Sequence, residues 1–253
     1  MADIKPQVYK DPRPPSLFQP FHEWTRTHRP GWTYELVRMI LTPIAILLYR
    51  ERAIGTRNVP ADGPFILAPN HFSQMDHFFA GVYIRRKIQF MAKSQLFGNP
   101  VLDHILRVGG VFPVRRGHHD EEAFRTAYTV LGRGGCIGMY CEGGRSRSGQ
   151  LGQPKPGVGR LALESGVPIV PVAIHGSLGV RRWKRLRFPK VTVQFGEPLA
   201  FTPVEAPDHV EQLEAAQQIF DRVKEMYAAL EAEGRKAVAA QFALPPGGEH
   251  ARG

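Results

Sequence analysis

The chain has 253 residues, and its 33 Lys and Arg against 23 Asp and Glu give a formal net charge of +10, which predicts an anionic partner such as nucleic acid, a phosphate-bearing substrate or an acidic membrane surface. Its 43% hydrophobic and 22% charged residues exclude wholesale disorder, and its two cysteines, Cys136 and Cys141, exclude a disulfide scaffold and favour a reducing compartment. No apolar run reaches the ~20 residues that a membrane-spanning helix needs, which excludes an ordinary multi-span membrane protein.

Residues 1–30 are rich in proline and are expected to form an irregular arm; no apolar stretch follows a basic start, so they do not resemble a cleavable signal. The most apolar part of the next segment, residues 39–49, would form a helix about 16 Å long, roughly half of a bilayer core. Pro43 would kink this helix, and aromatic and basic residues flank it. The pattern suits a membrane-interfacial helical segment over residues 31–54, although a buried core helix would explain the apolar residues equally well.

From residue 55 onward, short apolar, β-rich runs alternate with stretches of helical periodicity. The apolar runs span residues 65–68, 88–91, 111–114, 136–140, 169–174 and 191–195. Helices are expected after Asp120 with a stop at Gly132, and before a stop at Gly166. Strands that alternate with helices predict an α/β fold, so residues 55–204 should form a core with a mainly parallel central sheet flanked by helices.

The C-terminal part, residues 205–243, is expected to form an amphipathic helix packed on that core. Asp208 and Glu211 have the spacing of a capping box. The apolar positions that should face the core are Val210, Leu213, Phe220, Val223, Tyr227 and Leu230. Residues 205–234 hold eight acids and two bases, a net charge of −6, so the rest of the chain carries +16. The tail, residues 244–253, is expected to be frayed.

Residues 68–77 hold the strongest candidate for chemistry, because His71 follows a predicted strand and Asp76 comes five residues later. On a regular helix five residues turn ~500°, which would leave the two side chains ~140° apart. They can meet if His71 lies in the turn ahead of a helix and Asp76 in its first turns, and that turn would place His71 at a sheet edge where active sites form. Asp76 would then fix the imidazole tautomer and leave the other nitrogen free to take a proton. The alternative is a purely structural hydrogen bond.

Other patterns indicate no nucleophile, nucleotide loop or metal site. No Ser or Cys stands in a G-x-S-x-G context near His71, and the glycines of residues 132–135 precede a strand instead of following one. His118, His119 and the cysteines lack a four-ligand zinc set. The basic run 181–187 is interpreted as a solvated loop, with a membrane contact as the second choice.

Four short blocks of sequence follow one another along the chain. They are N-H-x₄-D at residues 70–76, a Gly–apolar stretch ending in Arg at 110–116, Tyr-Cys-Glu-Gly-Gly-Arg-Ser-Arg at 140–147, and an apolar run at 167–172. These blocks resemble those of the glycerolipid acyltransferases that include 1-acyl-sn-glycerol-3-phosphate (lysophosphatidic acid) acyltransferase. The resemblance covers roughly residues 35–200, and four blocks in order are far more specific than one.

The resemblance implies that the second block, with Gly110, Phe112, Arg115 and Arg116, binds the phosphate of the substrate. Strand alternation should send Arg115 and Arg116 to opposite sides, and the family pattern favours Arg116 for the cleft. An Arg side chain can hold a phosphate through two hydrogen bonds. If the block stood alone, two solvated surface arginines would be the better interpretation.

The third block, by the same resemblance, contributes Glu142 and Gly143 to acyl-acceptor binding and Arg145 as a second phosphate ligand. Glu142 could instead, or also, pair with a nearby Arg. Lys155, ahead of a predicted helix, resembles the family's Lys-x-Gly segment and could bind an anion or lie in a solvated basic loop. Three residues depart from the family's usual Phe, Pro and Thr: Tyr140, Cys141 and Gly144. These three departures weaken the assignment of the substrate more than the assignment of the reaction type, because Glu142, Gly143 and Arg145 are intact.

The resemblance therefore implies an O-acyltransferase that moves a fatty acyl group from acyl-CoA or acyl-ACP to a lysophospholipid hydroxyl, giving phosphatidic acid when the acceptor is 1-acyl-sn-glycerol-3-phosphate. His71 would be the general base and Asp76 its orienting partner, with no covalent acyl-enzyme. We expect no bound cofactor, metal or nucleic acid, and a peripheral or monotopic position on the cytoplasmic face of an anionic membrane. The alternatives are another lysolipid or glycolipid acceptor, a non-catalytic lipid-binding relative, and a nucleic-acid-binding protein.

Overall fold

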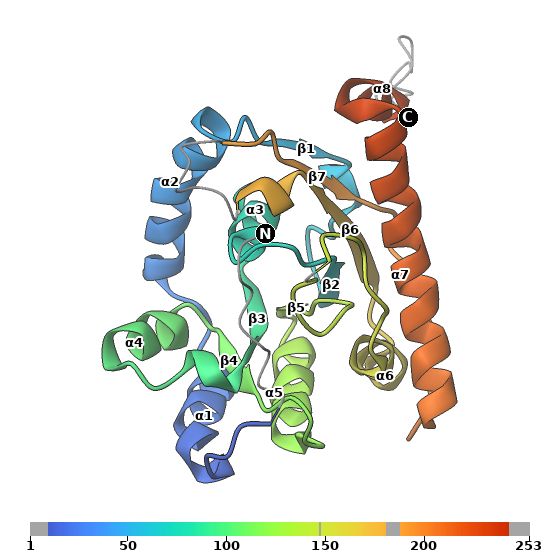
Figure 1. The fold of residues 1–253 in the computed structure, drawn as a ribbon. Helices are drawn as coiled ribbons and strands as arrows, with labels where there is room; N and C mark the ends of the chain where they lie inside the picture. The colour runs from blue at the N-terminus through green and yellow to red at the C-terminus, as the bar shows by residue number, and fades with distance from the viewer. Residues whose placement is uncertain (1–9, 147, 181–187, 243–253) are drawn as a thin grey trace, which may run out of the picture.

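The centre of the molecule is a twisted sheet (Figure 1). The computed structural model describes residues 10–146, 148–180 and 188–242. The strands are β1 (Arg52–Ile54), β2 (Phe65–Pro69), β3 (Ile88–Lys93), β4 (Phe112–Val114), β5 (Cys136–Gly138), β6 (Ile169–His175) and β7 (Thr192–Phe195). Within the described residues their order is β1-β7-β6-β2-β5-β3-β4, and each pair is parallel except β6–β7. The predicted mainly parallel α/β sheet is confirmed.

Helices cover both faces of this sheet. They are α1 (Gln19–Thr27), α2 (Trp32–Leu47), α3 (Asp76–Val82), α4 (Pro100–Val108), α5 (Glu121–Gly132), α6 (Pro156–Ser165), α7 (His209–Ala232) and α8 (Gly234–Gln241), with short 3-10 turns at Pro15–Phe18, Thr56–Asn58 and Ser94–Leu96. Residues of α5, α6 and α7 form the hydrophobic cluster on one face, and residues of α3 and the end of α2 contribute to the cluster on the other. Figure 1 accordingly shows α7 and α2 on opposite sides of the sheet.

The central strand β2 shows why this core forms. All five of its residues are buried, with Ile66 and Ala68 in the α5–α7 cluster and Phe65 and Leu67 in the α2–α3 cluster. Side chains alternate across a strand, and a parallel strand covered on both faces is apolar throughout. Burial of each of the larger side chains contributes about 1.5–3 kcal/mol to folding. The result is a rigid strand that ends just before His71.

The N-terminal arm differs from the sequence-based expectation. Residues 19–27 form α1 instead of irregular backbone, because Pro20 occupies the first turn of the helix, where its missing N–H costs nothing. The helix is fixed to α5, since Nδ1 of the buried His22 lies 3.0 Å from Thr126 Oγ1. The arm is therefore part of the packed fold over these residues.

Helix α2 lies on the outside of the molecule. It runs through Pro43, and Ala45 is the buried residue of this helix. Met39 and Leu47 are 67% and 75% exposed, so the interpretation as a buried core helix is wrong. Within the described residues, no helix combines the length and the apolar character needed to cross a bilayer.

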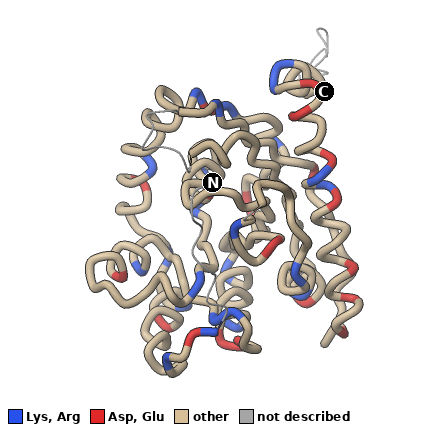
Figure 2. The backbone as a smooth tube through the Cα atoms, viewed as in Figure 1, with Lys and Arg blue, Asp and Glu red and all other residues tan. Residues whose placement is uncertain are grey.

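The C-terminal helix α7 begins with the predicted capping box of Asp208 and Glu211. Two expected core positions, Val210 and Leu213, are instead exposed. In this part of α7 the contact with α6 is made by backbone: a Cβ at Gly159 would lie 1.9 Å from the carbonyl oxygen of Gln212, so bulky side chains are left outside. Acidic residues recur along α7 (Figure 2). The tail 244–253 and the basic run 181–187 lie outside the described residues.

Candidate active site

The loop from β2 to α3 brings His71 and Asp76 together. His71 lies in the turn and Asp76 is the first residue of α3. Asp76 Oδ2 lies 2.9 Å from His71 Nδ1 and also accepts the backbone N–H groups of Phe72 and Ser73, each at 2.7 Å. The contact predicted from the five-residue spacing is confirmed. One carboxylate oxygen thus holds both the imidazole and the turn that carries it.

The environment of His71 favours a neutral imidazole. Its pKa is lowered chiefly by burial, against the opposing effect of Asp76, and the positive charges of Arg145 and Arg116 lower it further. The side chain is 12% exposed, less than an open turn would allow. With Nδ1 donating to the carboxylate of Asp76, the lone pair of Nε2 is the one left to accept a proton.

Tyr140 covers one face of the imidazole. The two rings stack with centroids 3.7 Å apart and an interplanar angle of 14°. Phe90 continues the stack on Tyr140 at 6.0 Å. The sequence marked Tyr140 as a departure from the family pattern but did not predict this contact. Its signal was an aromatic residue two positions before Glu142, just after a strand.

Glu142 is bound to backbone on both of its carboxylate oxygens. Oε1 accepts the N–H of His71 at 2.9 Å, and Oε2 accepts the N–H of Gly152 at 2.8 Å. Burial raises the pKa of Glu142, and these two hydrogen bonds partly offset the effect. Among the described residues no ion pair joins Glu142 to an Arg. Glu142 therefore anchors the backbone of His71, whereas its role toward an acyl acceptor stays a prediction.

Positive charge gathers beside His71. Arg116 and Arg145 lower the pKa of both His71 and Lys93, so their charges act on both groups. Lys93 ends β3, at the same carboxyl edge of the parallel strands as His71. Lys93 is not among the residues predicted from the sequence, although the end of the predicted strand at 88–91 could have indicated it.

Arg115 is directed to the N-terminal arm. Its guanidinium donates to the carbonyl oxygens of Asp11 and Arg13 in the N-terminal arm, at 3.4 and 3.1 Å. β4 ends at Val114, so both arginines lie beyond the strand whose alternation was expected to separate them. Arg115 ties the arm to β4, while Arg116 influences the site.

Two other residues of the second block lie inside the protein. Gly110 has φ +76°, and a Cβ there would lie 2.6 Å from Pro30 Cγ, so the position is filled by the arm. Phe112 is fully buried, with its ring 6.2 Å from that of His22. Their contacts are with the arm and core, and their predicted part in substrate binding remains a prediction.

Gly143, the residue after Glu142, lies next to Lys155. Gly143 has φ +63°, and a Cβ there would be 3.1 Å from Lys155 Cγ. Lys155 precedes α6, and its N–H donates to the carbonyl oxygen of Cys141 at 2.9 Å. The third block and the start of α6 are thereby joined around the same turn.

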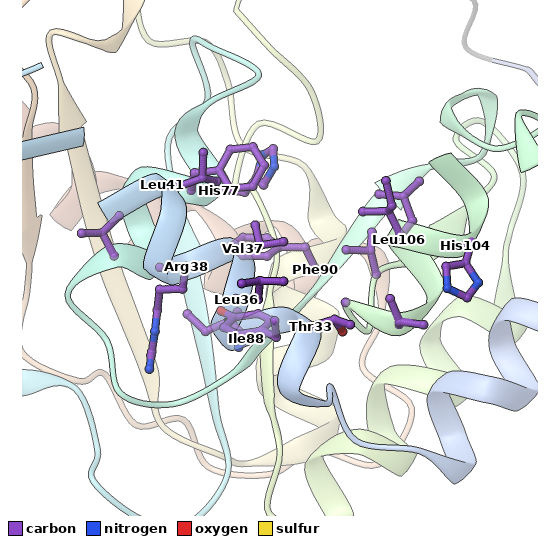
Figure 3. Close-up of a pocket in the computed structure, with 18 residues that line it drawn as sticks. Thr33, Leu36, Val37, Arg38, Leu41, His77, Ile88, Phe90, His104 and Leu106 are labelled. Atoms are coloured by element: carbon purple, nitrogen blue, oxygen red, sulfur yellow. Dashed lines mark hydrogen bonds between the residues drawn. The ribbon is translucent and has the colours of Figure 1, made fainter. Parts of the chain in front are cut away.

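An apolar pocket of about 310 Å³ opens between α2, α3, β3 and α4 (Figure 3). The residues that Figure 3 labels include Leu36 and Val37 from α2, and Leu106 from α4. Its wall also contains His77 and Phe90, whose ring centroids are 6.0 Å apart. Because Phe90 also stacks on Tyr140, a chain of rings links the pocket wall to His71.

Comparisons with known proteins agree with this arrangement. The Acyltransferase family model matches residues 51–175, a span that includes His71, Asp76 and Glu142. A curated 1-acyl-sn-glycerol-3-phosphate acyltransferase of Bacillus subtilis is 29% identical over 168 residues, covering 66% of this chain and 82% of that protein. The family model spans just under half of the chain, and over this part the chain is similar to the 1-acyl-sn-glycerol-3-phosphate acyltransferases.

Two other similar proteins cover different shares of this chain. A chloroplastic 1-acyl-sn-glycerol-3-phosphate acyltransferase of Brassica napus is 27% identical over 132 residues, which span 51% of this chain and 38% of the plant protein. The crystal structure of the 1-acyl-sn-glycerophosphate acyltransferase PlsC from Thermotoga maritima superimposes with a TM-score of 0.59 at 22% identity, covering 85% of this chain and 89% of that one. This likeness shows that the two share a fold.

Proposed function

We propose that this protein moves a fatty acyl group from acyl-CoA or acyl-ACP to the free hydroxyl of a lysophospholipid. Its acceptor is 1-acyl-sn-glycerol-3-phosphate and its product phosphatidic acid. The observation that carries the proposal is the His71–Asp76 pair at the carboxyl edge of the sheet. Both residues occupy the positions of the N-H-x₄-D block, and the named relatives act on this acceptor by their printed names.

In the proposed reaction His71 is the general base. Nε2 takes the proton of the acceptor hydroxyl as its oxygen attacks the thioester carbonyl, and the C–S bond breaks as the new ester bond forms. The proton then passes from the imidazolium to the departing thiolate. Asp76 keeps Nδ1 protonated and stabilises the transient imidazolium. General-base catalysis by His71 contributes about 10²–10⁴-fold in rate.

The positive charges beside His71 suit the phosphate of the acceptor. Arg116 and Arg145 act on His71 electrostatically, and Lys93 shares their neighbourhood. A phosphate held by these groups would bring the glycerol hydroxyl near Nε2, and an Arg side chain can hold it through two hydrogen bonds.

The apolar pocket suits the acyl chain. Its apolar lining and its connection to His71 through Phe90 and Tyr140 support this assignment. Both the pocket and the exposed face of α2 would receive lipid from a bilayer without passing it through water. We therefore place the enzyme at the cytoplasmic face of a membrane, as a peripheral or monotopic protein.

The test is turnover by the purified protein with labelled acyl-CoA or acyl-ACP and a panel of lysolipids and glycolipids. We expect turnover with 1-acyl-sn-glycerol-3-phosphate, and a loss of at least about 10²-fold in His71→Ala. His209→Ala, an exposed histidine at the start of α7, is the matched control and should retain full activity.

Because His71 is largely covered, thermal melting must show that the variant is folded, and His71→Asn provides a second test of similar size. Near-normal thioester consumption in a folded His71 variant would refute the mechanism. Turnover confined to another lysolipid or to a glycolipid would refute the proposed acceptor while leaving the reaction class intact.

A further inference from the structure

A second cavity, of about 300 Å³, lies at the opposite edge of the sheet from His71. It is formed by the residues that precede β3 and β5 and by the loop between α1 and α2, whereas His71 follows the carboxyl end of the parallel neighbour β2. The cations that line it are Arg29, Arg85, Arg86, Lys87 and Arg133. No Asp or Glu is among its described lining residues.

Backbone carbonyls hold several of these cations in place. Arg86 donates to the carbonyl oxygen of Gly134 at 2.8 Å, and Lys87 to that of Pro30 at 3.0 Å. One acid reaches these cations from outside the lining: Glu35 Oε1 lies 3.8 Å from Lys87 Nζ, and Glu35 also pairs with Arg38. Carbonyl oxygens orient a guanidinium or ammonium group without cancelling its charge, so the cavity keeps a strong positive potential.

Two side-chain donors of residues that line this cavity have no hydrogen-bond partner among the described residues. One is Nε2 of Gln89, a side chain that is 3% exposed, and the other is Nε of Arg133. A buried donor without an acceptor is destabilising, and a bound anion would supply acceptor oxygens. Burial and the nearby charge of Arg29 lower the pKa of Arg133, which an anion in the cavity would reverse.

We propose that this cavity, lined by Arg29, Arg85, Arg86, Lys87, Gln89 and Arg133, is a binding site for a phosphate group, separate from the acyl-transfer site. A phosphate supplies several acceptor oxygens and up to two negative charges, which matches clustered arginines better than a single carboxylate does. The cavity volume suits a phosphate with a small substituent and not a nucleic-acid duplex.

The phosphate could belong to a soluble metabolite or to the headgroup of a phospholipid that is not a substrate. The rim of the cavity at Pro30 is two residues from Trp32, where the exposed helix α2 begins, so a headgroup is within reach of a bilayer on that side. The experiment therefore has two arms that separate these sources.

The first arm measures binding of inorganic phosphate by calorimetry at constant ionic strength. It uses Arg116→Ala as the background, so that binding beside His71 contributes less. Adding Arg29→Ala and Arg85→Ala, both exposed arginines, should weaken binding at least about ten-fold, because charge-assisted hydrogen bonds are lost. Gln89→Leu removes the unpaired donor at similar volume and should also weaken binding, by about three-fold or more.

The matched control replaces Arg57 and Arg125, two exposed arginines outside the cavity, with alanine. It lowers the net charge equally and should leave phosphate affinity within about two-fold. Equal losses of phosphate affinity in the cavity pair and in the control pair would overturn the proposal. It would also be overturned if no phosphate binding were measured and the cavity and control pairs bound equally to the vesicles described next.

The second arm measures sedimentation with phosphatidylcholine vesicles, with and without phosphatidic acid. A loss of sedimentation in the cavity pair and not in the control pair identifies the ligand as a lipid headgroup. Weaker binding of inorganic phosphate with unchanged sedimentation identifies a soluble phosphate. Both arms measure binding and not turnover. Their results therefore test the phosphate site even if the proposed acyl transfer is refuted.

Discussion

Two contacts orient the imidazole of His71, one in the plane of the ring and one on its face. The in-plane contact is the hydrogen bond between Nδ1 and Asp76, and the contact on the face is the stacked ring of Tyr140. Glu142 in turn holds the His71 backbone N–H, and the His71 carbonyl accepts the N–H of Ser146 at 2.8 Å. A base held in this way loses little entropy when a substrate arrives, which is the usual requirement for efficient general-base catalysis.

The proposed phosphate contact of Arg116 predicts a selective change in substrate binding. Arg116→Ala should raise KM about ten-fold or more for 1-acyl-sn-glycerol-3-phosphate and much less for the dephosphorylated monoacylglycerol, because the lost interaction is with the phosphate. Steady-state kinetics with both acceptors measure the difference. An equal change for the two acceptors would contradict the phosphate role.

Arg115→Ala is the comparison for that experiment. Its guanidinium binds carbonyls of the N-terminal arm, so its loss should lower the melting temperature and leave the preference between the two acceptors unchanged.

The sequence predicted the central pair of the site but not its surroundings. Spacing alone required His71 in a turn and Asp76 at a helix start, because no other local geometry lets them meet. The stacking of Tyr140, the backbone contacts of Glu142 and the approach of Lys93 depend on how β3 and β5 are placed beside β2. Such contacts between distant segments are not encoded in local periodicity.

Among the elements, α2 has the most unusual surface. Its outer side carries large apolar residues that nothing in the described structure covers, including Trp32, Met39, Ile40 and Leu47. A group of large exposed apolar side chains on one helix marks an interaction surface. Together with its flanking arginines it supports the proposed membrane contact.

Replacing Met39, Ile40 and Leu47 with serine should reduce sedimentation with vesicles of phosphatidylcholine and phosphatidic acid several-fold, because less apolar area enters the interface. The melting temperature should change little, since these side chains are exposed. The matched control is Val210→Ser with Leu213→Ser, which removes exposed apolar residues from α7 on the other side of the sheet. Sedimentation reduced equally by both sets would rule out α2 as the specific contact.

Elements with clear apolar patterns were predicted from the sequence, whereas α1, α4 and β1 were not. The predicted elements are the strands β2 to β7 and the helices α5, α6 and α7. In α1 and α4 the prolines Pro20 and Pro100 start a helix, although proline also marks loops, and β1 is three residues long with one buried side chain. Local sequence does not distinguish these cases.

On the scale of the whole molecule, the stability of the fold should depend on the protonation of Glu51. This residue is 3% exposed at the junction of α2 and β1, and neither carboxyl oxygen has a partner among the described residues. Burial raises its pKa to about 8, so the folded protein keeps the proton after the unfolded chain has released it. The contribution of neutral Glu51 is therefore complete below about pH 4.5 and is lost as the pH rises through about 8.

Glu51→Gln should resist urea about as well as the wild type near pH 5 and should be more stable by roughly 2 kcal/mol near pH 9. Urea unfolding at both pH values measures the difference. Glu205→Gln, an exposed acid, is the control and should track the wild type throughout. A variant whose advantage does not grow with pH would show that Glu51 is not ionising inside the fold.

The separation of α7 from α2 across the sheet gives the molecule an electrical polarity. Residues 205–234 carry a net charge of −6, and the remainder of the chain carries +16. Near an anionic bilayer the acidic side is repelled and the opposite side is attracted, so the protein would be turned before it touches the lipid. The helix with the exposed apolar side chains then arrives first, and α7 is left facing water.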